Sequence, residues 1–415
     1  MGLQDCEITL DNPWNTYYAG QTLNGQVKLA LNSPKTIRGI IIRFLGEANT
    51  SWSETKKVRD DQGKEHDETE ELTGHEEYFE NHYYLLGAKN GAEINLPAGE
   101  HTYPFTCVLP QNLPSSYEGE FGHVRYTIKV TLDRPWKFDQ DTKMAFTVIS
   151  PLDLNQNARL KEPMRLSLEK TFCCFCCKSG PLEADVTIPA GGYVPGQSIP
   201  ISAEINNASN IKVDRLRVIL RKTVVFKTNS PRRDLKKEKT TIAEISVGPV
   251  DGHSSKNWQQ NIEIPPLPPS NLINCGIIDL DYELKIELNV SGAHRDLEGK
   301  LPITLGTVPL ATTQLPNTAP YTDVPQQQPS QPVQDPSQAP TQPVSPASPP
   351  GDSNTAGWNL YPSIPPPSYA ESEYRANIVD KNDSQHTRFA GGQDQFAPRY
   401  PVYAGQTLPT APKPQ

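Results

Sequence analysis

The chain has 415 residues, 41 of them proline, and a formal net charge of −9 at pH 7. This length allows about two to three domains, and the negative charge disfavours a nucleic-acid-binding protein. Because 21 of the prolines lie within residues 309–415, the composition predicts two folded domains followed by a disordered tail.

Two features predict a cytoplasmic protein. The sequence contains no run of 18 apolar residues that could span a membrane. The first ten residues include Asp5 and Glu7, where a signal peptide would carry a basic segment and then an apolar one. In that compartment the seven cysteines are expected to be reduced thiols.

An internal duplication organises the first 308 residues. The segment Tyr17–Leu23 matches Tyr193–Ile199 at an offset of 176 residues, and apolar alternation follows both copies. Farther along, Tyr126–Leu132 matches Tyr282–Leu288 at an offset of 156 residues. The first copy therefore carries about 20 extra residues between these points.

The extra residues are expected in an acidic insert, residues 53–82. This stretch holds eleven Asp and Glu against four Lys and Arg. It shows no sustained hydrophobic periodicity, so we expect a long solvated loop.

Apart from this insert, both copies show short runs of alternating apolar residues, broken every 8–12 residues by Gly, Pro, Asn or Ser. A period of two indicates half-buried strands, and the spacing is typical of antiparallel β-sandwiches. We therefore predict an all-β protein with an N-terminal sandwich at 1–150, a hinge and linking strand at 151–179, a C-terminal sandwich at 180–308 and a disordered proline-rich tail at 309–415.

Five further segments form a distinctive set: Leu96–Phe105, Leu109–Pro110, Tyr117–Gly119, Ser150–Asn155 and Ile264–Pro269. They resemble the arrestin-domain-containing proteins, the α-arrestins, and the resemblance covers about residues 1–310. It implies two tandem arrestin-like, immunoglobulin-like β-sandwiches joined by a short hinge. Two similar sandwiches side by side offer a long composite surface, which favours protein recognition over catalysis.

The tail contains a PPxY motif formed by Pro366, Pro367 and Tyr369. Consecutive prolines hold the backbone near polyproline II, a helix that WW domains clamp between aromatic rings while a second pocket takes the tyrosine. Proline-rich linkers also produce such strings by chance. In the α-arrestins the motif recruits HECT-type ubiquitin ligases that carry WW domains. Pro398 and Tyr400 form a degenerate second copy without the first proline.

Two more short motifs in the tail belong to membrane-protein trafficking. The run Pro409, Thr410, Ala411 and Pro412 resembles the ligands of ESCRT-I. Tyr361 and Ile364 fit the tyrosine-based sorting pattern that clathrin adaptors bind, and the same stretch loosely fits the ligands of an ESCRT accessory protein. Both patterns are permissive and arise readily in a tail of this composition.

A basic stretch in the second copy is a candidate site for an anionic partner. Arg232, Arg233, Lys236 and Lys237 stand out on an otherwise acidic chain. They could contact phosphorylated receptor tails or anionic lipid, where each basic residue contributes about 1 kcal/mol. A solvated hairpin tip is the alternative.

The Cys173–Cys177 run contains four thiols, and four thiols can bind zinc in a tetrahedral site. If the run pairs with residues 182–188 as a hairpin, same-face residues lie about 7 Å apart, too far for one zinc ion without bending. Reduced structural thiols and S-acylation near a membrane are the other interpretations. No metal or other cofactor is predicted, and because the chain contains no nucleophile elbow, P-loop or dinucleotide fingerprint, we predict no catalytic residues and no enzyme.

Together these features predict an adaptor that links membrane receptors or transporters to a WW-domain HECT-type ubiquitin ligase. It would promote cargo ubiquitylation, endocytosis and endosomal sorting, with ESCRT-I and clathrin adaptors as further partners. We expect peripheral membrane association only, with recruitment from the cytoplasm to the plasma membrane and endosomes. A retromer-type or coat-type sorting subunit, a redox or metabolic regulator of the same fold, and an enzyme are the alternatives. The sequence identifies neither the cargo, the ligase, the activating signal nor the oligomeric state.

Overall fold

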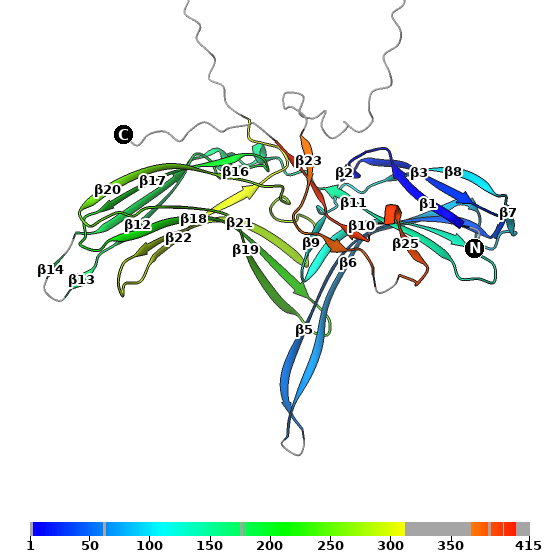
Figure 1. Cartoon of the computed structure of the whole chain (residues 1–415), viewed down its shortest axis with the longest axis horizontal. Helices are drawn as coiled ribbons and strands as arrows, with labels where there is room; N and C mark the ends of the chain where they lie inside the picture. Colours follow the sequence, from blue (N-terminus) through cyan, green and yellow to red (C-terminus); the bar gives the residue numbers. More distant parts are fainter. Residues whose placement is uncertain are drawn as a thin grey trace, which may run out of the picture.

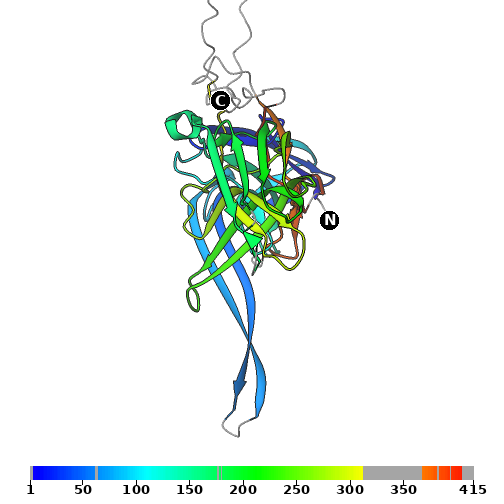
Figure 2. The same ribbon diagram turned by 90° about the vertical axis from the view of Figure 1, so that its left-hand side faces the viewer.

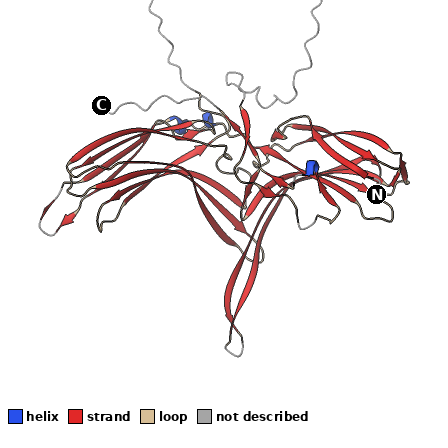
Figure 3. Ribbon diagram, viewed as in Figure 1, coloured by secondary structure: helices blue, strands red, loops and turns tan. Residues whose placement is uncertain are grey.

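The computed structural model describes residues 3–60, 64–174, 177–178, 180–311, 367–380, 383–392 and 394–403. The described chain is built almost entirely from strands (Figure 3). Two β-sandwiches lie end to end, and a long two-stranded ribbon projects from the region between them (Figure 1). The ribbon also extends well beyond both sandwiches in the perpendicular view (Figure 2). The prediction of an all-β protein with two arrestin-like domains is confirmed.

The N-terminal sandwich pairs a small sheet with a larger one. The small sheet has the order β1 (Leu3–Leu10), β3 (Thr22–Leu31), β8 (Gly99–Val108). The larger sheet has the order β2 (Thr16–Tyr18), β11 (Gln140–Ile149), β10 (Gly122–Asp133), β5 (Gly39–Arg59), β6 (Glu65–Gly87), with β9 (Tyr117–Gly119) added to β10. A separate pair joins β4 (Lys35–Ile37) to β7 (Ile94–Leu96).

The C-terminal sandwich repeats this arrangement. One sheet has the order β12 (Met164–Lys170), β15 (Leu182–Ile188), β17 (Ser198–Asn207), β20 (Ser254–Glu263). The other has the order β16 (Gly192–Tyr193), β22 (Leu297–Leu305), β21 (Ile278–Val290), β18 (Val213–Thr228), β19 (Asp234–Val247). Between the sandwiches lie two short 3-10 turns, η1 (Leu154–Gln156) and η2 (Ala158–Lys161).

Strand register confirms the duplication. In β5 and β10, Phe44 pairs with Ile128, and in β18 and β21 the residues at the two sequence offsets, Leu220 and Leu284, also pair. All four side chains are fully buried. Apolar residues that alternate along these strands therefore form the cores, because every second side chain faces the opposite sheet.

The acidic insert is a ribbon, so the prediction of a solvated loop at residues 53–82 is wrong. β5 and β6 run 21 and 23 residues, against 16 and 14 for β18 and β19. Beyond Trp52 most ribbon side chains are exposed, which removes the hydrophobic period that would have identified the strands. Cross-strand charge pairs such as Arg59 with Glu65, 2.8 Å apart, accompany the backbone ladder there.

The cysteine run does not pair as the sequence suggested. β15 pairs instead with β17 and with β12, whose half-buried Leu166 and Leu168 alternate with exposed residues. The cysteine segment forms its own small hairpin of β13 (Cys173–Cys174) and β14 (Cys177–Lys178). The argument against zinc assumed that the cysteine run pairs with residues 182–188, and this pairing is absent among the described residues.

Part of the tail folds back on the sandwiches. β23 (Ser368–Glu371) pairs with β27 (Arg399–Val402), and β24 (Ala376–Asn377) pairs with β26 (Gln395–Phe396). β25 (Thr387–Phe389) adds to β11 in parallel, and the turn η5 (Ala390–Gly392) follows it. For these residues the composition did not indicate order. We call residues 367–403, as far as they are described, the docked segment.

Candidate functional site: the docked segment and its seam

The PPxY motif begins outside the described residues and ends inside them. Pro366 is not described, whereas Pro367 and Tyr369 are. Tyr369 lies on β23, opposite Pro401 of β27, and its side chain is half-buried. Its hydroxyl lies 3.4 Å from the hydroxyl of Tyr18 in the N-terminal sandwich. Burial raises the pKa of Tyr369 and that of Tyr18, so both phenols are neutral at physiological pH.

The neighbouring strand β27 lies in the seam between the two sandwiches. Tyr400 is 1% exposed, and its hydroxyl donates a 2.9 Å hydrogen bond to the Ser116 carbonyl of the N-terminal sandwich. Tyr403 reaches the other sandwich, where its hydroxyl donates to the Thr307 carbonyl at 2.6 Å and its amide donates to the Pro195 carbonyl at 2.9 Å. The docked segment therefore bridges both domains.

Tyrosine suits these two positions. A buried phenol contributes a large apolar ring to the seam, and its hydroxyl needs one hydrogen-bond partner. Tyr400 and Tyr403 find backbone carbonyls. The degenerate second WW motif, Pro398 and Tyr400, is consequently covered in this conformation, and its binding to a WW domain would require release of β27.

Charged groups hold the preceding part of the docked segment. Lys143 of β11 is 5% exposed and forms ion pairs with Asp380 and Asp383, the latter at 2.9 Å. Its ammonium also donates to the Ile378 carbonyl at 3.2 Å. All three partners belong to the docked segment, which therefore covers the Lys143 ammonium and compensates its charge.

A second buried pair lies beside Lys143. Two hydrogen bonds of 2.8 Å join Arg125 to Glu118, whose side chains are 4% and 1% exposed. Burial raises the pKa of Glu118, and the Arg125 guanidinium opposes that rise. Arg125 also lies 3.6 Å from Asp380. The docked segment thus adds its carboxylate to an existing ion pair.

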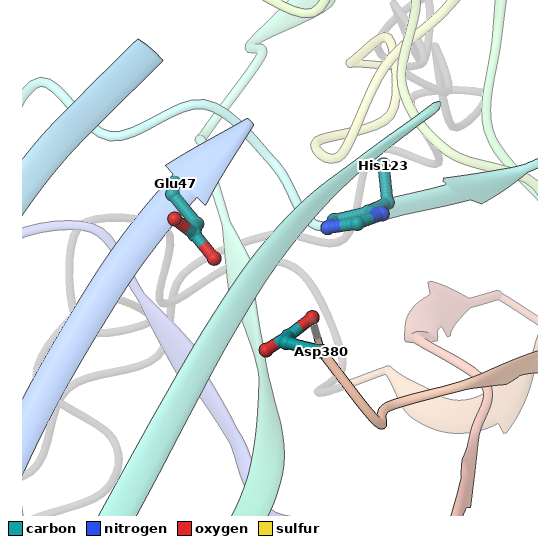
Figure 4. A group of neighbouring side chains, drawn as sticks. All are labelled: Glu47, His123 and Asp380. Atoms are coloured by element: carbon teal, nitrogen blue, oxygen red, sulfur yellow. The ribbon is translucent and has the colours of Figure 1, made fainter. Parts of the chain in front are cut away.

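Asp380 completes a small group of metal-type ligands with Glu47 and His123 (Figure 4). One ligand atom from each lies within 4.8 Å of the others. Burial, together with the cations Arg125 and Lys143, lowers the pKa of His123 to about 3. A cavity of about 270 Å³ that Glu47, Lys143 and Asp380 help to line opens beside them. Because Lys143 and Arg125 already neutralise Asp380, a divalent cation would meet two fixed positive charges, and we assign no metal here.

The predicted basic site is only partly free. Arg232 forms ion pairs with Glu54 and Glu70 of the ribbon and with Asp234. The ammonium of Lys236 lies 3.8 Å from the ring centroid of Phe121, a cation–π contact. Arg232 and Lys236 therefore join the sandwiches and are half-buried, whereas Arg233 and Lys237 are exposed. The assignment of all four to an anionic partner stays a prediction.

Three described cysteines have thiols that are buried or partly buried. Cys6 and Cys107 are buried, and Cys275 is partly buried. Burial raises the pKa of Cys6 to about 11 and also raises the pKa of Cys107 and Cys275. Among these three described thiols, none is activated as a nucleophile.

The remaining tail motifs cannot be placed. Tyr361 and Ile364 of the sorting pattern lie outside the described residues, as do Pro409, Thr410, Ala411 and Pro412. Among the residues that are described, none forms a helix with the length and hydropathy of a membrane span.

Sequence reasoning missed the residues that hold the docked segment: Tyr18, Arg125, Lys143, Asp380, Asp383 and Tyr403. One signal was present in the duplication. Lys143 occupies the register position of Lys300 in the second copy, where Glu283 is the partner. At the position of Glu283 the first copy has Thr127, so a buried lysine at 143 would need an acid from elsewhere.

Comparisons with known proteins agree with the fold. The family model for the N-terminal domain of arrestin (or S-antigen) matches residues 6–155, and the model for the C-terminal domain matches residues 178–310. Arrestin domain-containing protein 17 of Caenorhabditis elegans is 30% identical over 96% of this chain and 98% of its own length.

Two mammalian proteins show a similar likeness over a smaller share of the chain. Mouse arrestin domain-containing protein 4 is 30% identical over 72% of this chain and 70% of its own length. Human arrestin domain-containing protein 1 is 29% identical over 78% of this chain and 71% of its own length. From the two domains and these relatives, the chain belongs to the arrestin-domain-containing family, the α-arrestins.

Proposed function

We propose that the protein is an adaptor that brings a WW-domain HECT-type ubiquitin ligase to membrane-protein cargo. The observation that carries the proposal is a PPxY motif, completed by Tyr369, on the tail of a two-sandwich arrestin core. The sandwiches supply a long surface for a protein partner. Residues 312–366 form a proline-rich connection, which would hold a bound ligase at high effective concentration near the core.

In this proposal ubiquitin transfer is the chemistry of the ligase, and the chain contributes recognition. Cargo would be a membrane receptor or transporter bound by the sandwiches at the plasma membrane or endosomes. The motif at Pro409–Pro412 would pass ubiquitylated cargo to ESCRT-I, and Tyr361 with Ile364 would engage clathrin adaptors. Membrane association would be peripheral, and the exposed Arg233 and Lys237 would contribute to it.

Peptide binding tests the ligase step. A synthetic peptide of residues 360–374 should bind WW domains of HECT-type ligases in calorimetry. Tyr369→Ala should weaken binding at least about 30-fold, because a central aromatic anchor typically contributes 2 kcal/mol or more. Phosphorylation of Tyr369 should also weaken binding, since it adds a charge of about −1.5 to −2 to a group that enters a neutral pocket.

Tyr361→Ala is the matched control, because it removes a tyrosine of the same peptide outside the PPxY motif. Equal binding by the wild-type and Tyr369→Ala peptides would overturn the proposal. A second experiment compares proteins that co-purify with the full chain and with its Tyr369→Ala variant, and partners lost from the variant are those that depend on the ligase. Cargo bound by the sandwiches should remain in both samples.

A further inference from the structure

We infer that the seam between the sandwiches and a WW domain compete for Tyr369, so that the docked segment restrains ligase binding. This inference rests on the proposed function, because it concerns the regulation of the same motif. The seam is thus an interaction surface whose occupant is residues 367–403 of the chain itself.

The first argument is the backbone around Tyr369. Residues 368–371 form a strand whose partner is β27, with Ser368 opposite Val402 and Glu371 opposite Arg399. A WW domain binds PPxY as a polyproline II helix and encloses the tyrosine ring. In the docked segment that ring is half-buried beside Tyr18. The two environments exclude each other, because one side chain cannot fill both pockets.

The second argument is the anchoring of β27, the strand that holds β23. Tyr400 is 1% exposed, and Tyr403 is 3% exposed. The amide of Arg399 donates to the Thr147 hydroxyl of β11 at 3.1 Å. These contacts involve both sandwiches, so the seam must be assembled for β27, and with it Tyr369, to dock.

The third argument is the charge pairing at Lys143. Removal of the docked segment would leave this lysine without the carboxylates of Asp380 and Asp383 and without the Ile378 carbonyl. While the segment is docked, Lys143 is only 5% exposed, and charge-assisted contacts of this kind are stronger than neutral hydrogen bonds, so pairing at Lys143 favours the docked state. Asp380 and Asp383 lie outside the PPxY motif, and for this reason they can be changed without altering the sequence that a WW domain contacts.

Competition has a measurable consequence. When the binding-competent state is only a fraction of the population, the apparent Kd rises by the inverse of that fraction. If 1–10% of molecules are undocked, the full chain should bind a WW domain about 10–100-fold more weakly than the 360–374 peptide. Weakening the docked state should recover that affinity.

The experiment measures the Kd of one isolated WW domain, chosen for tight binding to the 360–374 peptide, against full-length variants. The double variant Asp380→Asn with Asp383→Asn should bind at least about 5-fold more tightly than the wild-type chain, since it removes both acids at Lys143. Asp394→Asn is the control, because Asp394 is an exposed acid of the same segment. It should leave the Kd unchanged.

A charge exchange makes the test specific. Lys143→Asp should release the docked segment, and adding Asp383→Lys to it should restore weak binding by rebuilding the pair with reversed charges. If Lys143→Asp fails to fold, the Asn variants still decide, because they change only the docked segment. A full chain that binds as tightly as the peptide, with no gain from the Asn variants, would overturn the inference and leave the proposed function standing. A peptide that does not bind would instead remove the proposed function.

Discussion

The two sandwiches share a frame but differ in how they satisfy their charges. At the start of each copy a glutamine closes the same turn, with Gln21 accepting from the Tyr18 amide at 2.7 Å and Gln197 from the Val194 amide at 3.0 Å. Gly20 and Gly196 have φ values of +86° and +87° there, a region that glycine adopts without steric cost. Both copies therefore form the same turn with the same glutamine and glycine.

The difference lies on the sheet faces. Lys129 faces Lys143 across β10 and β11, as Lys285 faces Lys300 across β21 and β22. In the second copy Lys300 pairs with Glu283 of its own sheet at 3.3 Å and is 53% exposed. In the first copy Lys143 is 5% exposed and pairs with the docked segment. The equivalent lysine therefore pairs with an acid of its own sheet in the C-terminal sandwich and with acids of the tail in the N-terminal sandwich.

The largest expected effect concerns the buried pair that only the N-terminal copy has at this position. Glu118→Ala should lower the free energy of unfolding by about 3–5 kcal/mol, because it leaves the Arg125 guanidinium buried without its closest carboxylate. Asp281 occupies the Arg125 position in the second copy and is exposed. Asp281→Ala should change the free energy by no more than about 0.5 kcal/mol.

Urea denaturation of the full-length variants, followed by tryptophan fluorescence, measures both changes. Equal small losses for the two variants would show that the Arg125–Glu118 pair is not the asymmetric feature that we describe.

A pH profile examines the same region. Burial, Arg125 and Lys143 hold the pKa of His123 near 3 in the folded protein, whereas a free histidine titrates near 6.5. Below pH about 6.5 the unfolded chain binds a proton that the folded chain does not. This histidine therefore lowers stability progressively as the pH falls from about 6.5 toward 3.

His123→Asn should reduce the slope of unfolding free energy against pH in that window, by up to about 1.4 kcal/mol per pH unit. His66→Asn, at an exposed position on the ribbon, serves as the control. Unchanged slopes for both variants, measured by denaturation from pH 6.5 to 4, would contradict the lowered pKa of His123.

Two tyrosines should behave alike in both copies. Tyr126 donates its hydroxyl proton to the Pro114 carbonyl at 2.6 Å, and Tyr282 donates to the Pro268 carbonyl at 2.9 Å. Tyr126→Phe and Tyr282→Phe should each cost about 1 kcal/mol, the usual contribution of a buried hydrogen bond. Thermal and urea unfolding of both variants would reveal unequal costs if the two anchors are not equivalent.

The smallest effect is expected at the ribbon. Arg232 contacts Glu54 and Glu70, and the neighbouring amides of Asn229 and Ser230 donate to the Thr73 carbonyl. Arg232→Ala should speed hydrogen exchange at those two amides, because the hairpin tip loses side-chain contacts with the ribbon. Arg233→Ala, at the adjacent exposed position, should leave them unchanged. Faster exchange at these amides in Arg233→Ala than in Arg232→Ala would show that Arg232 does not hold the hairpin tip against the ribbon.

Much of the fold could be predicted because buried strands leave a period of two in the sequence. The two offsets matched equivalent positions of the copies, and the structure pairs those positions in the same way, Phe44 with Ile128 and Leu220 with Leu284. The ribbon was missed because its outer half buries neither face, so no hydrophobic period marks it.

The candidate site was less predictable. Its short motif is local in sequence, and consecutive prolines before a tyrosine identify it. Its environment is not local, because the contacts of Tyr369 with Tyr18 and of Tyr400 with Ser116 join positions more than 280 residues apart. Composition alone predicted a flexible tail here, because the segment has too few large apolar residues to build a core of its own. Composition does not reveal that a few aromatic residues can dock on a seam that other parts of the chain have formed.

Hydrogen exchange of residues 367–403 in the full chain tests the central claim most directly. The Ser372 and Tyr403 amides donate to the carbonyls of Pro398 and Pro195 in the docked state, at 2.8 and 2.9 Å. Their exchange should be slower than in an isolated peptide of residues 360–415, because docking protects these amides, and a saturating WW domain should remove the protection. Identical exchange in the chain and in the peptide would show that the segment does not dock on the sandwiches.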